Sequence, residues 1–321
     1  MLVSLSKPPR LTVVIPSLDG DRNGRLAELL EALKRQSFRD FEVRVVLGDP
    51  RQGRAINQAV RSGGSDIIVT LDDDSQLGHR RVLENLVRAI DADPTIGIAG
   101  GSTVPAPDAS WMQRAACRQI PRRYFPVVDR VVDSDMAQHP CLAMRREVFE
   151  AVGGEDEELI RGLDPDLRHR VRQAGYRVTI VPDTWVGHPL PEGLGKLFGM
   201  FVRNGRGSAF ARRHFGERVY ELTDGTPDLK FAPQRPFWYR LVRYPFRMLR
   251  SVVAFHWIKF LSEVAYLAGY LQETLFSART AEPPPPPGRM IHYPSPAHLP
   301  GPEFEPARPS QRETVRLAAA R

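Results

Sequence analysis

Cysteine is nearly absent from this sequence. Only Cys117 and Cys141 occur among its 321 residues, and their spacing fits none of the common metal-binding patterns. Two cysteines are also too few to build a disulfide framework. We therefore expect two reduced thiols in a protein of a reducing compartment.

Long apolar runs are absent as well. The first ten residues, Met1–Arg10, lack the apolar core of a signal peptide and lead directly into a strand-like segment. No stretch reaches the roughly 18 consecutive apolar residues of a membrane-spanning helix. These absences favour a cytoplasmic location.

The charge is not balanced. Lys and Arg outnumber Asp and Glu 45 to 38, which gives a formal net charge of +7. This excess favours anionic partners such as phosphates, nucleotides or an anionic lipid surface. A nucleic-acid partner is not expected, because no motif of a nucleic-acid-binding module accompanies the charge.

The first hundred residues alternate between short apolar runs and helical patterns. The runs are bounded by Pro, Gly or Asp and are typical of buried parallel strands: Leu11–Ile15, Val43–Leu47 and Ile67–Leu71. Apolar residues at helical spacing follow each run, at Arg25–Gln36, Arg54–Arg61 and Arg80–Ile90. This order predicts a doubly wound α/β fold, with a mixed, mostly parallel sheet flanked by helices.

The rest of the chain is less regular. Further strands are predicted at Ile96–Ala99 and Val178–Val181, and a helix at Asp166–Ala174 that ends before Gly175. Pro236–Phe276 is basic, aromatic and helical in period, so we expect amphipathic helices that pack on the rest of the protein or lie on a membrane. From residue 282 onward the proline-rich sequence predicts a disordered tail.

Three adjacent carboxylates, Asp72, Asp73 and Asp74, follow the third apolar run. The carboxyl ends of strands in such sheets are where ligands bind. Like charges this close repel unless a cation neutralises them, and Asp72 and Asp74 could both turn toward one divalent ion. Mg²⁺ or Mn²⁺ prefers such oxygen ligands together with substrate phosphates. The alternative is a solvated acidic turn or a helix N-cap.

Five segments in order resemble the glycosyltransferase family 2 with the GT-A fold, over roughly residues 10–215. They are Val13–Ser17, Arg54–Asn57, the Asp72–Asp74 triplet, Cys141–Phe149 with Gly153–Gly154, and Gly162–Leu167 with Arg170 and Gly175. The resemblance implies a catalytic domain at 1–215, with a nucleotide-binding half at about 10–100 and an acceptor half at 101–215. Residues 216–281 would form the basic helical region and 282–321 the tail.

The resemblance also implies roles for individual residues. Asp164 would be the general base, and Asp72, Asp74 and His188 would hold Mg²⁺ or Mn²⁺. His188 lies after the strand at Val178–Val181 and a loop at Pro182–Gly187, and a lone loop histidine is also often an ordinary surface residue. The residues that the resemblance assigns to the nucleotide of the donor are Pro16, Asp49, Arg54, Asn57, Asp72 and Asp73.

Departures from the family pattern refine the expected function. Leu163 stands where the family usually has Glu, and the Gln-x-x-Arg-Trp motif of processive polysaccharide synthases is missing. The resemblance implies an inverting, non-processive enzyme that transfers a sugar from a nucleoside diphosphate to a hydroxyl of a saccharide or lipid-linked acceptor. Two alternatives remain open. One is a nucleotidyltransferase, although Pro16–Gly20 is not a glycine-rich basic loop; the other is a non-catalytic nucleotide-sugar or membrane-surface binding protein.

Overall fold

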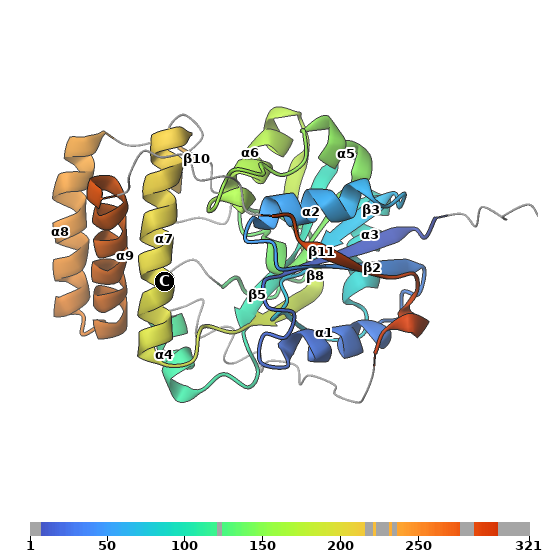
Figure 1. Ribbon diagram of the computed structural model, residues 1–321, viewed down its shortest axis with the longest axis horizontal. Helices are drawn as coiled ribbons and strands as arrows, with labels where there is room; N and C mark the ends of the chain where they lie inside the picture. The colour runs from blue at the N-terminus through green and yellow to red at the C-terminus, as the bar shows by residue number, and fades with distance from the viewer. Residues whose placement is uncertain are drawn as a thin grey trace, which may run out of the picture.

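A computed structural model describes residues 8–120, 124–215, 236–276 and 286–300, together with two short strands, β9 (Glu221–Leu222) and β10 (Phe231–Ala232). The predicted mixed α/β sheet flanked by helices is confirmed (Figure 1). Beside it lies a layer of three long helices: α7 (Leu194–His214), α8 (Phe237–Val253) and α9 (Trp257–Phe276).

The main sheet has the order β11-β2-β1-β3-β7-β5-β8-β4, and β6 pairs with β8. Its strands are β1 (Leu11–Ser17), β2 (Phe41–Leu47), β3 (Ile67–Thr70), β4 (Gln76–Leu77), β5 (Ile96–Pro105), β6 (Val132–Asp133), β7 (Leu142–Arg145), β8 (Arg177–His188) and β11 (Arg289–Tyr293). The pairs β1–β2, β1–β3 and β5–β8 are parallel, and the other pairs of this sheet are antiparallel. Two of the three parallel pairs therefore lie in the β2–β1–β3 half, and the third, β5–β8, lies in the other half.

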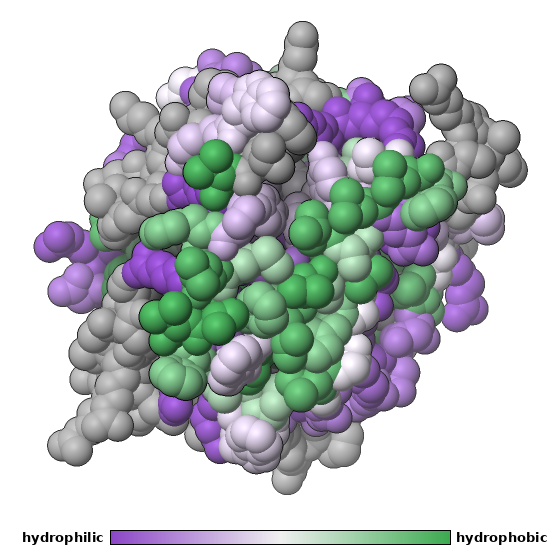
Figure 2. All heavy atoms as spheres, turned by 90° about the vertical axis from the view of Figure 1, so that its left-hand side faces the viewer, coloured by the Kyte–Doolittle hydropathy of each residue, from purple (hydrophilic) through white to green (hydrophobic). Residues whose placement is uncertain are grey.

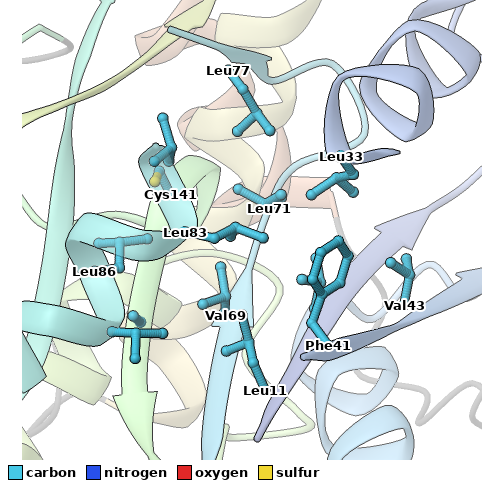
Figure 3. Close-up of a cluster of buried hydrophobic side chains, with 14 of the residues drawn as sticks. Leu11, Leu33, Phe41, Val43, Val69, Leu71, Leu77, Leu83, Leu86 and Cys141 are labelled. Carbon is cyan, nitrogen blue, oxygen red and sulfur yellow. The ribbon is translucent and has the colours of Figure 1, made fainter. Parts of the chain in front are cut away.

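Helices cover both faces of the sheet, because the side chains of each strand alternate between two cores. Leu11, Val13 and Ile15 of β1 pack with α1 (Arg25–Lys34) and α3 (Val82–Ala92). Val14 faces the opposite core, with α2 (Gln52–Arg61), α5 (Arg146–Ala151) and α6 (Leu163–Gln173). Figure 3 shows side chains of the first core, including Leu83 of α3 and Cys141. Both cysteines are buried free thiols.

Three predicted boundaries are wrong. The expected loop at Pro182–Gly187 is part of β8, which continues to His188 past an irregularity at Asp183, where φ is 45°. The helix expected at Asp166 begins at Leu163, because Gly162 takes the left-handed conformation that lets the chain enter the helix. Asp164 therefore lies in the first turn of α6.

The third error concerns the C-terminal tail. Residues 286–300 are not disordered: β11 adds to the edge of the sheet antiparallel to β2, and Leu299 is buried in the core with α1 and α3. Met290 and Ile291 of β11 pack against the two cores. The apolar alternation of this short strand was hidden behind the preceding prolines. Residues 282–285 and 301–321 lie outside the described residues.

The layer of long helices is attached to the α/β part through α7 and the start of α9. Gly205 of α7 and Gly269 of α9 lie against the backbone of the opposite helix: a Cβ on Gly205 would be 2.0 Å from the Tyr266 carbonyl oxygen. The backbone N–H of Ile258 donates to the side chain of Gln119, which ends α4 (Trp111–Gln119), at 2.9 Å. The boundary expected at residue 215 follows the end of α7, and α9 from the region beyond it packs closely on α7. Among the described residues, no helix is long and apolar enough to cross a membrane.

Candidate active site

The Asp triplet leaves the carboxyl end of β3, and the chain then turns sharply into β4. The Ser75 N–H donates to the Asp72 carbonyl at 3.0 Å and closes this turn. Strand β4 pairs antiparallel with the end of β8, so that Gln76 lies opposite Gly187. This pairing places His188, the last residue of β8, beside the carboxylates although more than a hundred residues separate them in sequence.

His188 lies between two carboxylates. Its Nε2 is 3.3 Å from Oδ2 of Asp72 and 3.2 Å from Oδ1 of Asp74. Burial disfavours the imidazolium, but the charge of Asp74 and the hydrogen bonds with Asp72 and Asp74 outweigh it and raise the pKa of His188 to about 9. Asp74 is buried too, yet His188 and then Arg22 hold its pKa well below the usual range.

The middle carboxylate, Asp73, is directed toward β1 and not toward His188. Asp73 accepts a hydrogen bond of 2.6 Å from the Ser17 hydroxyl at the end of β1. Burial raises the pKa of Asp73 to about 6, against the opposing effects of Ser17 and Arg22. The Arg22 Nε lies 3.5 Å from Asp73 and 3.2 Å from Asp74, so this guanidinium also compensates the acidic cluster.

The three predicted metal ligands fit a divalent cation. One donor atom from each of Asp72, Asp74 and His188 lies within 4.8 Å of the other two. Two carboxylates and one imidazole supply a donor set that Mn²⁺ accepts, and three protein ligands leave coordination positions for phosphate oxygens. Gln52, at the start of α2, donates to Oδ1 of Asp72 at 3.1 Å and restrains that carboxylate.

Just beyond the carboxyl end of β2, Asp49 forms a bidentate ion pair with Arg54. Both contacts between the Arg54 guanidinium and the Asp49 carboxylate measure 2.8 Å. Asp49 also accepts from the backbone N–H groups of Arg51 at 2.9 Å and Gly288 at 3.2 Å. Burial opposes ionisation of Asp49, but these donors outweigh it and lower its pKa. Through Gly288, the segment before β11 thus contacts Asp49, which the resemblance assigns to binding of the donor nucleotide.

The other two residues assigned to the nucleotide are placed differently. Pro16 lies in β1 opposite Val46 of β2, partly exposed near the carboxyl end of the sheet. Asn57 is buried in α2, and its amide donates to the Glu155 carbonyl at 2.8 Å and accepts from the Glu155 N–H at 2.9 Å. The Asn57 side chain therefore fixes the 153–157 loop, and the structure does not bring it to the Asp triplet.

Asp164, the expected base, is held next to the end of β3 by a buried histidine. Its Oδ1 accepts from the His139 backbone N–H at 2.8 Å. His139 begins the 3-10 turn η1 (His139–Cys141), and its Nδ1 is 3.1 Å from the hydroxyl of Thr70 in β3. The next residue, Pro140, accepts a 2.9 Å hydrogen bond from Ser75. One turn thus joins Asp164 to the strand that carries the Asp triplet.

A buried carboxyl group lies behind this turn. Oε1 of Glu155 is 3.3 Å from Nε2 of His139, and both side chains are almost fully buried. Burial raises the pKa of Glu155 to about 7, although His139 and Arg170 favour its ionised form. Burial also opposes ionisation of His139, but Asp164 and Glu155 raise its pKa. Asp164 itself keeps 32% of its side chain exposed, so it is accessible to a substrate.

Leu163, the departure from the family pattern, has a packing role. It is buried with Leu159, Ala211 of α7 and the neighbouring Phe215. A charged side chain at this position would be desolvated without a partner in that cluster. With Leu in place of the family's usual Glu, this packing attaches the start of α6, and with it Asp164, to the long helix α7.

Sequence reasoning missed the roles of four side chains: Ser17, Arg22 and Gln52 contact the Asp triplet, and Glu155 contacts His139. Ser17 was quoted within a motif but given no role. Arg22 lies in a polar loop without periodicity, and Glu155 is surrounded by other acidic residues. No local pattern separated them from surface residues, because their contacts depend on the tertiary fold.

Residues 14–153 match the family model described as Glycosyl transferase family 2. This match supports a glycosyltransferase family 2 domain. It covers Asp49, Arg54 and the Asp triplet, whereas Asp164 and His188 lie beyond it. No curated protein matches the chain.

Among solved structures, the chain resembles a mannosyltransferase, PcManGT from Pyrobaculum calidifontis, in complex with GDP-Man and Mn²⁺. The TM-score is 0.52 and the identity 16%, over 84% of this chain and 88% of that one. This likeness shows the GT-A fold. S. aureus TarS matches with a TM-score of 0.41 and 14% identity, over 65% of this chain and 43% of that chain. A structure of TarS 1–349 with UDP-GlcNAc gives a TM-score of 0.42 and 12% identity, over 62% and 66%.

Proposed function

We propose that this protein is a metal-dependent, inverting glycosyltransferase that transfers one sugar at a time from a nucleoside diphosphate to a hydroxyl of a saccharide or lipid-linked acceptor. The observation that carries the proposal is the joining of two sites by one turn. The Asp72–Asp74–His188 cluster and Asp164 lie on either side of η1, through the contacts of Thr70, Ser75 and His139.

The donor would bind along the carboxyl ends of β1 and β2. Asp49 and Arg54 would contact the nucleotide there, and Asp72, Asp74 and His188 would hold Mg²⁺ or Mn²⁺. The bound ion would neutralise the negative charge of the diphosphate. Arg22, which already pairs with Asp73 and Asp74, adds a cation at the same place.

Transfer requires a proton acceptor for the incoming hydroxyl. The acceptor oxygen forms a bond to the anomeric carbon while the bond from that carbon to the diphosphate oxygen breaks, and Asp164 takes the hydroxyl proton. The His139 N–H orients the Asp164 carboxylate through one oxygen. A well-placed base contributes roughly 10²- to 10⁴-fold to such a step. A single displacement with one base inverts the configuration of the anomeric carbon.

The test is a donor screen on the full chain and an Asp164→Asn variant, with Mn²⁺, Mg²⁺ or EDTA. GDP-mannose and UDP-GlcNAc come first, because structural relatives were crystallised with them. We expect ion-dependent release of nucleoside diphosphate, a loss of about 10²-fold or more in Asp164→Asn, and unchanged nucleotide binding. Asp66→Asn, at an exposed surface ion pair, is the matched control.

The same screen separates the alternatives. If the Asp164→Asn variant still turned over the donor, Asp164 would not be the general base. Synthesis of a nucleotide sugar from a sugar phosphate and a nucleoside triphosphate would identify a nucleotidyltransferase. Nucleotide binding without turnover of any donor would favour a non-catalytic binding protein. A product with several added sugars would contradict single transfer.

A further inference from the structure

Most large apolar side chains that are exposed on the described part of the chain belong to α8 and α9. In α8 they recur every three or four residues along one side; in α9 a second series has the same spacing except for one step of seven residues. The first series is Trp238, Val242, Phe246, Leu249 and Val253, and the second is Trp257, Leu261, Val264, Leu271 and Leu275. Figure 2 shows the continuous apolar surface on this side of the molecule. We call α8 and α9 together the hairpin, and these exposed residues the hairpin face.

The hairpin face is not an uncovered part of the core around the main sheet. The opposite side of α9 is packed on α7, where a Cβ on Gly269 would lie 2.1 Å from the Val202 carbonyl oxygen. Its start is attached to α4 through Ile258 and Gln119. The hairpin is therefore held on one side by the catalytic part, and only its outer side is open to another partner.

The charges around this face are of one sign. Arg243, Arg247 and Arg250 lie one position after Val242, Phe246 and Leu249, so they border the apolar series along α8. The sequence of α8 contains no Asp or Glu. The two carboxylates of α9 are buried: Glu263 pairs with Arg247 at 2.8 Å, and Glu273 lies 3.6 Å from Arg206 of α7. Among the described residues, the outer side of α8 and α9 thus combines apolar side chains with cations and presents no exposed carboxylate.

We propose that the hairpin face is a docking surface for an anionic lipid bilayer, on which α8 and α9 lie parallel to the membrane plane. Apolar side chains would enter the boundary between head groups and acyl chains, and Arg243 and Arg250 would meet lipid phosphates. A second copy of this chain is a poorer occupant. A symmetric pairing of two hairpin faces would bring the arginines of both together without an exposed carboxylate to compensate them.

The experiment is co-sedimentation of the full chain with lipid vesicles. Vesicles of phosphatidylcholine alone are compared with vesicles that contain about a third phosphatidylglycerol, at low and high salt. We expect binding to the anionic vesicles only, and weaker binding at high salt because the arginine contacts are screened. This proposal does not rest on the enzymatic activity, so a failed donor screen would leave it untouched.

Two variants locate the contact. Phe246→Gln with Leu249→Gln removes two exposed apolar side chains, and should weaken vesicle binding by about tenfold or more while leaving the melting temperature unchanged. Arg243→Gln with Arg250→Gln should weaken binding and reduce its salt dependence. Val131→Gln with Ile160→Gln is the control, since both side chains are exposed outside the hairpin.

Three outcomes would overturn the proposal: no binding of the wild type to anionic vesicles, equally tight binding to neutral vesicles, or unchanged binding of the Phe246 and Leu249 double variant. A wild type that elutes as a dimer, and becomes a monomer in that double variant, would assign the hairpin face to a second copy instead.

Discussion

At the scale of single residues, three neighbouring aspartates of one triplet have three different environments. Asp72 is restrained by Gln52, Asp73 by Ser17, and Asp74 is paired with His188 and Arg22. The turn after β3 directs Asp72 and Asp74 toward His188, and Asp73 toward Ser17. Adjacent carboxylates can coexist here because each has its own donor or cation.

The first prediction concerns His188. Replacing it by Asn removes the only imidazole of the Asp72–Asp74–His188 cluster, so Mn²⁺ affinity should fall by about tenfold or more. Isothermal titration of Mn²⁺ into the metal-free protein, with nucleoside diphosphate present, measures this. His256→Asn, at an exposed position between α8 and α9, should bind Mn²⁺ like the wild type. Equal affinities in all three proteins would remove His188 from the metal site.

The second prediction concerns pH. The pKa of His188 is raised to about 9 in the folded protein from an ordinary value of 6.5, so its imidazolium stabilises the metal-free fold. This contribution is complete below pH 6.5 and is lost as the pH rises through 9. The difference in free energy of unfolding between wild type and His188→Asn, measured in EDTA, should therefore shrink over that window. A difference that stays constant from pH 6.5 to 9.5 would contradict the ion pairs of His188.

Sequence reasoning was most effective for residues next to regular elements. It placed Asp72, Asp74 and His188 in one group, and the structure brings their donor atoms together. It could not find the contacts of Arg22 or the Glu155–His139 pair, because these join segments far apart in sequence without a local pattern. It also assigned Asn57 to the nucleotide from the resemblance, and that role stays a prediction; in the structure the amide of Asn57 hydrogen-bonds the backbone of Glu155.

At the scale of elements, the strand order explains how distant segments meet at one edge. Antiparallel β7 lies between β3 and β5, and antiparallel β4 brings the end of β8 to the Asp triplet. The runs of β1, β2 and β3 are rich in β-branched residues and could be read from sequence. Strand β4 has only two residues, β7 contains no β-branched residue, and β11 follows a run of prolines, so the same signal was missing there.

The third prediction tests the contact between the C-terminal segment and Asp49. A Cβ on Gly288 would lie 2.7 Å from Val46 Cγ1 and 2.9 Å from the Asp49 Cβ. Gly288→Val should therefore force the segment from Asp49, reduce the stability of the protein by about 1–3 kcal/mol, and weaken nucleotide binding. Chemical denaturation and nucleotide titration measure the two effects.

Gly195→Val is the matched control, because a Cβ on Gly195 meets nothing within 4 Å. If Gly288→Val lost stability but bound nucleotide as the wild type does, the segment would support the sheet without contributing to the donor site. If both properties were unchanged, the close packing at Gly288 would be wrong.

At the scale of the whole molecule, α7 connects the catalytic part with the hairpin of α8 and α9 (Figure 1). Arg51, two residues after Asp49, stacks over Phe210 of α7 at 5.8 Å from the ring centre. Leu163, next to Asp164, packs on Ala211 of the same helix. Helix α7, which packs against the hairpin, thus contacts the neighbours of both Asp49 and Asp164. The helical period of 236–276 was visible in the sequence, but its position beside α7 depends on the two close glycines.

The fourth prediction addresses this packing. Gly205→Ala would place a methyl group 2.0 Å from the Tyr266 carbonyl oxygen and should separate α7 from α9, lowering the melting temperature by several degrees. Gly199→Ala, in the same helix, has only the end of the Arg203 side chain at 3.9 Å and should be neutral or slightly stabilising. Thermal unfolding of both variants, and proteolysis between α7 and α8, make the comparison. Equal stability of the two variants would contradict the close crossing.

The central claim is that one divalent ion at Asp72, Asp74 and His188 holds the diphosphate of the donor. Anomalous diffraction at the manganese absorption edge, from crystals grown with Mn²⁺ and a nucleoside diphosphate, tests it most directly. We expect one strong manganese peak in contact with those three side chains and with diphosphate oxygens, and Asp164 facing the open side of that site. A manganese peak elsewhere, or a diphosphate bound away from the Asp triplet, would contradict it.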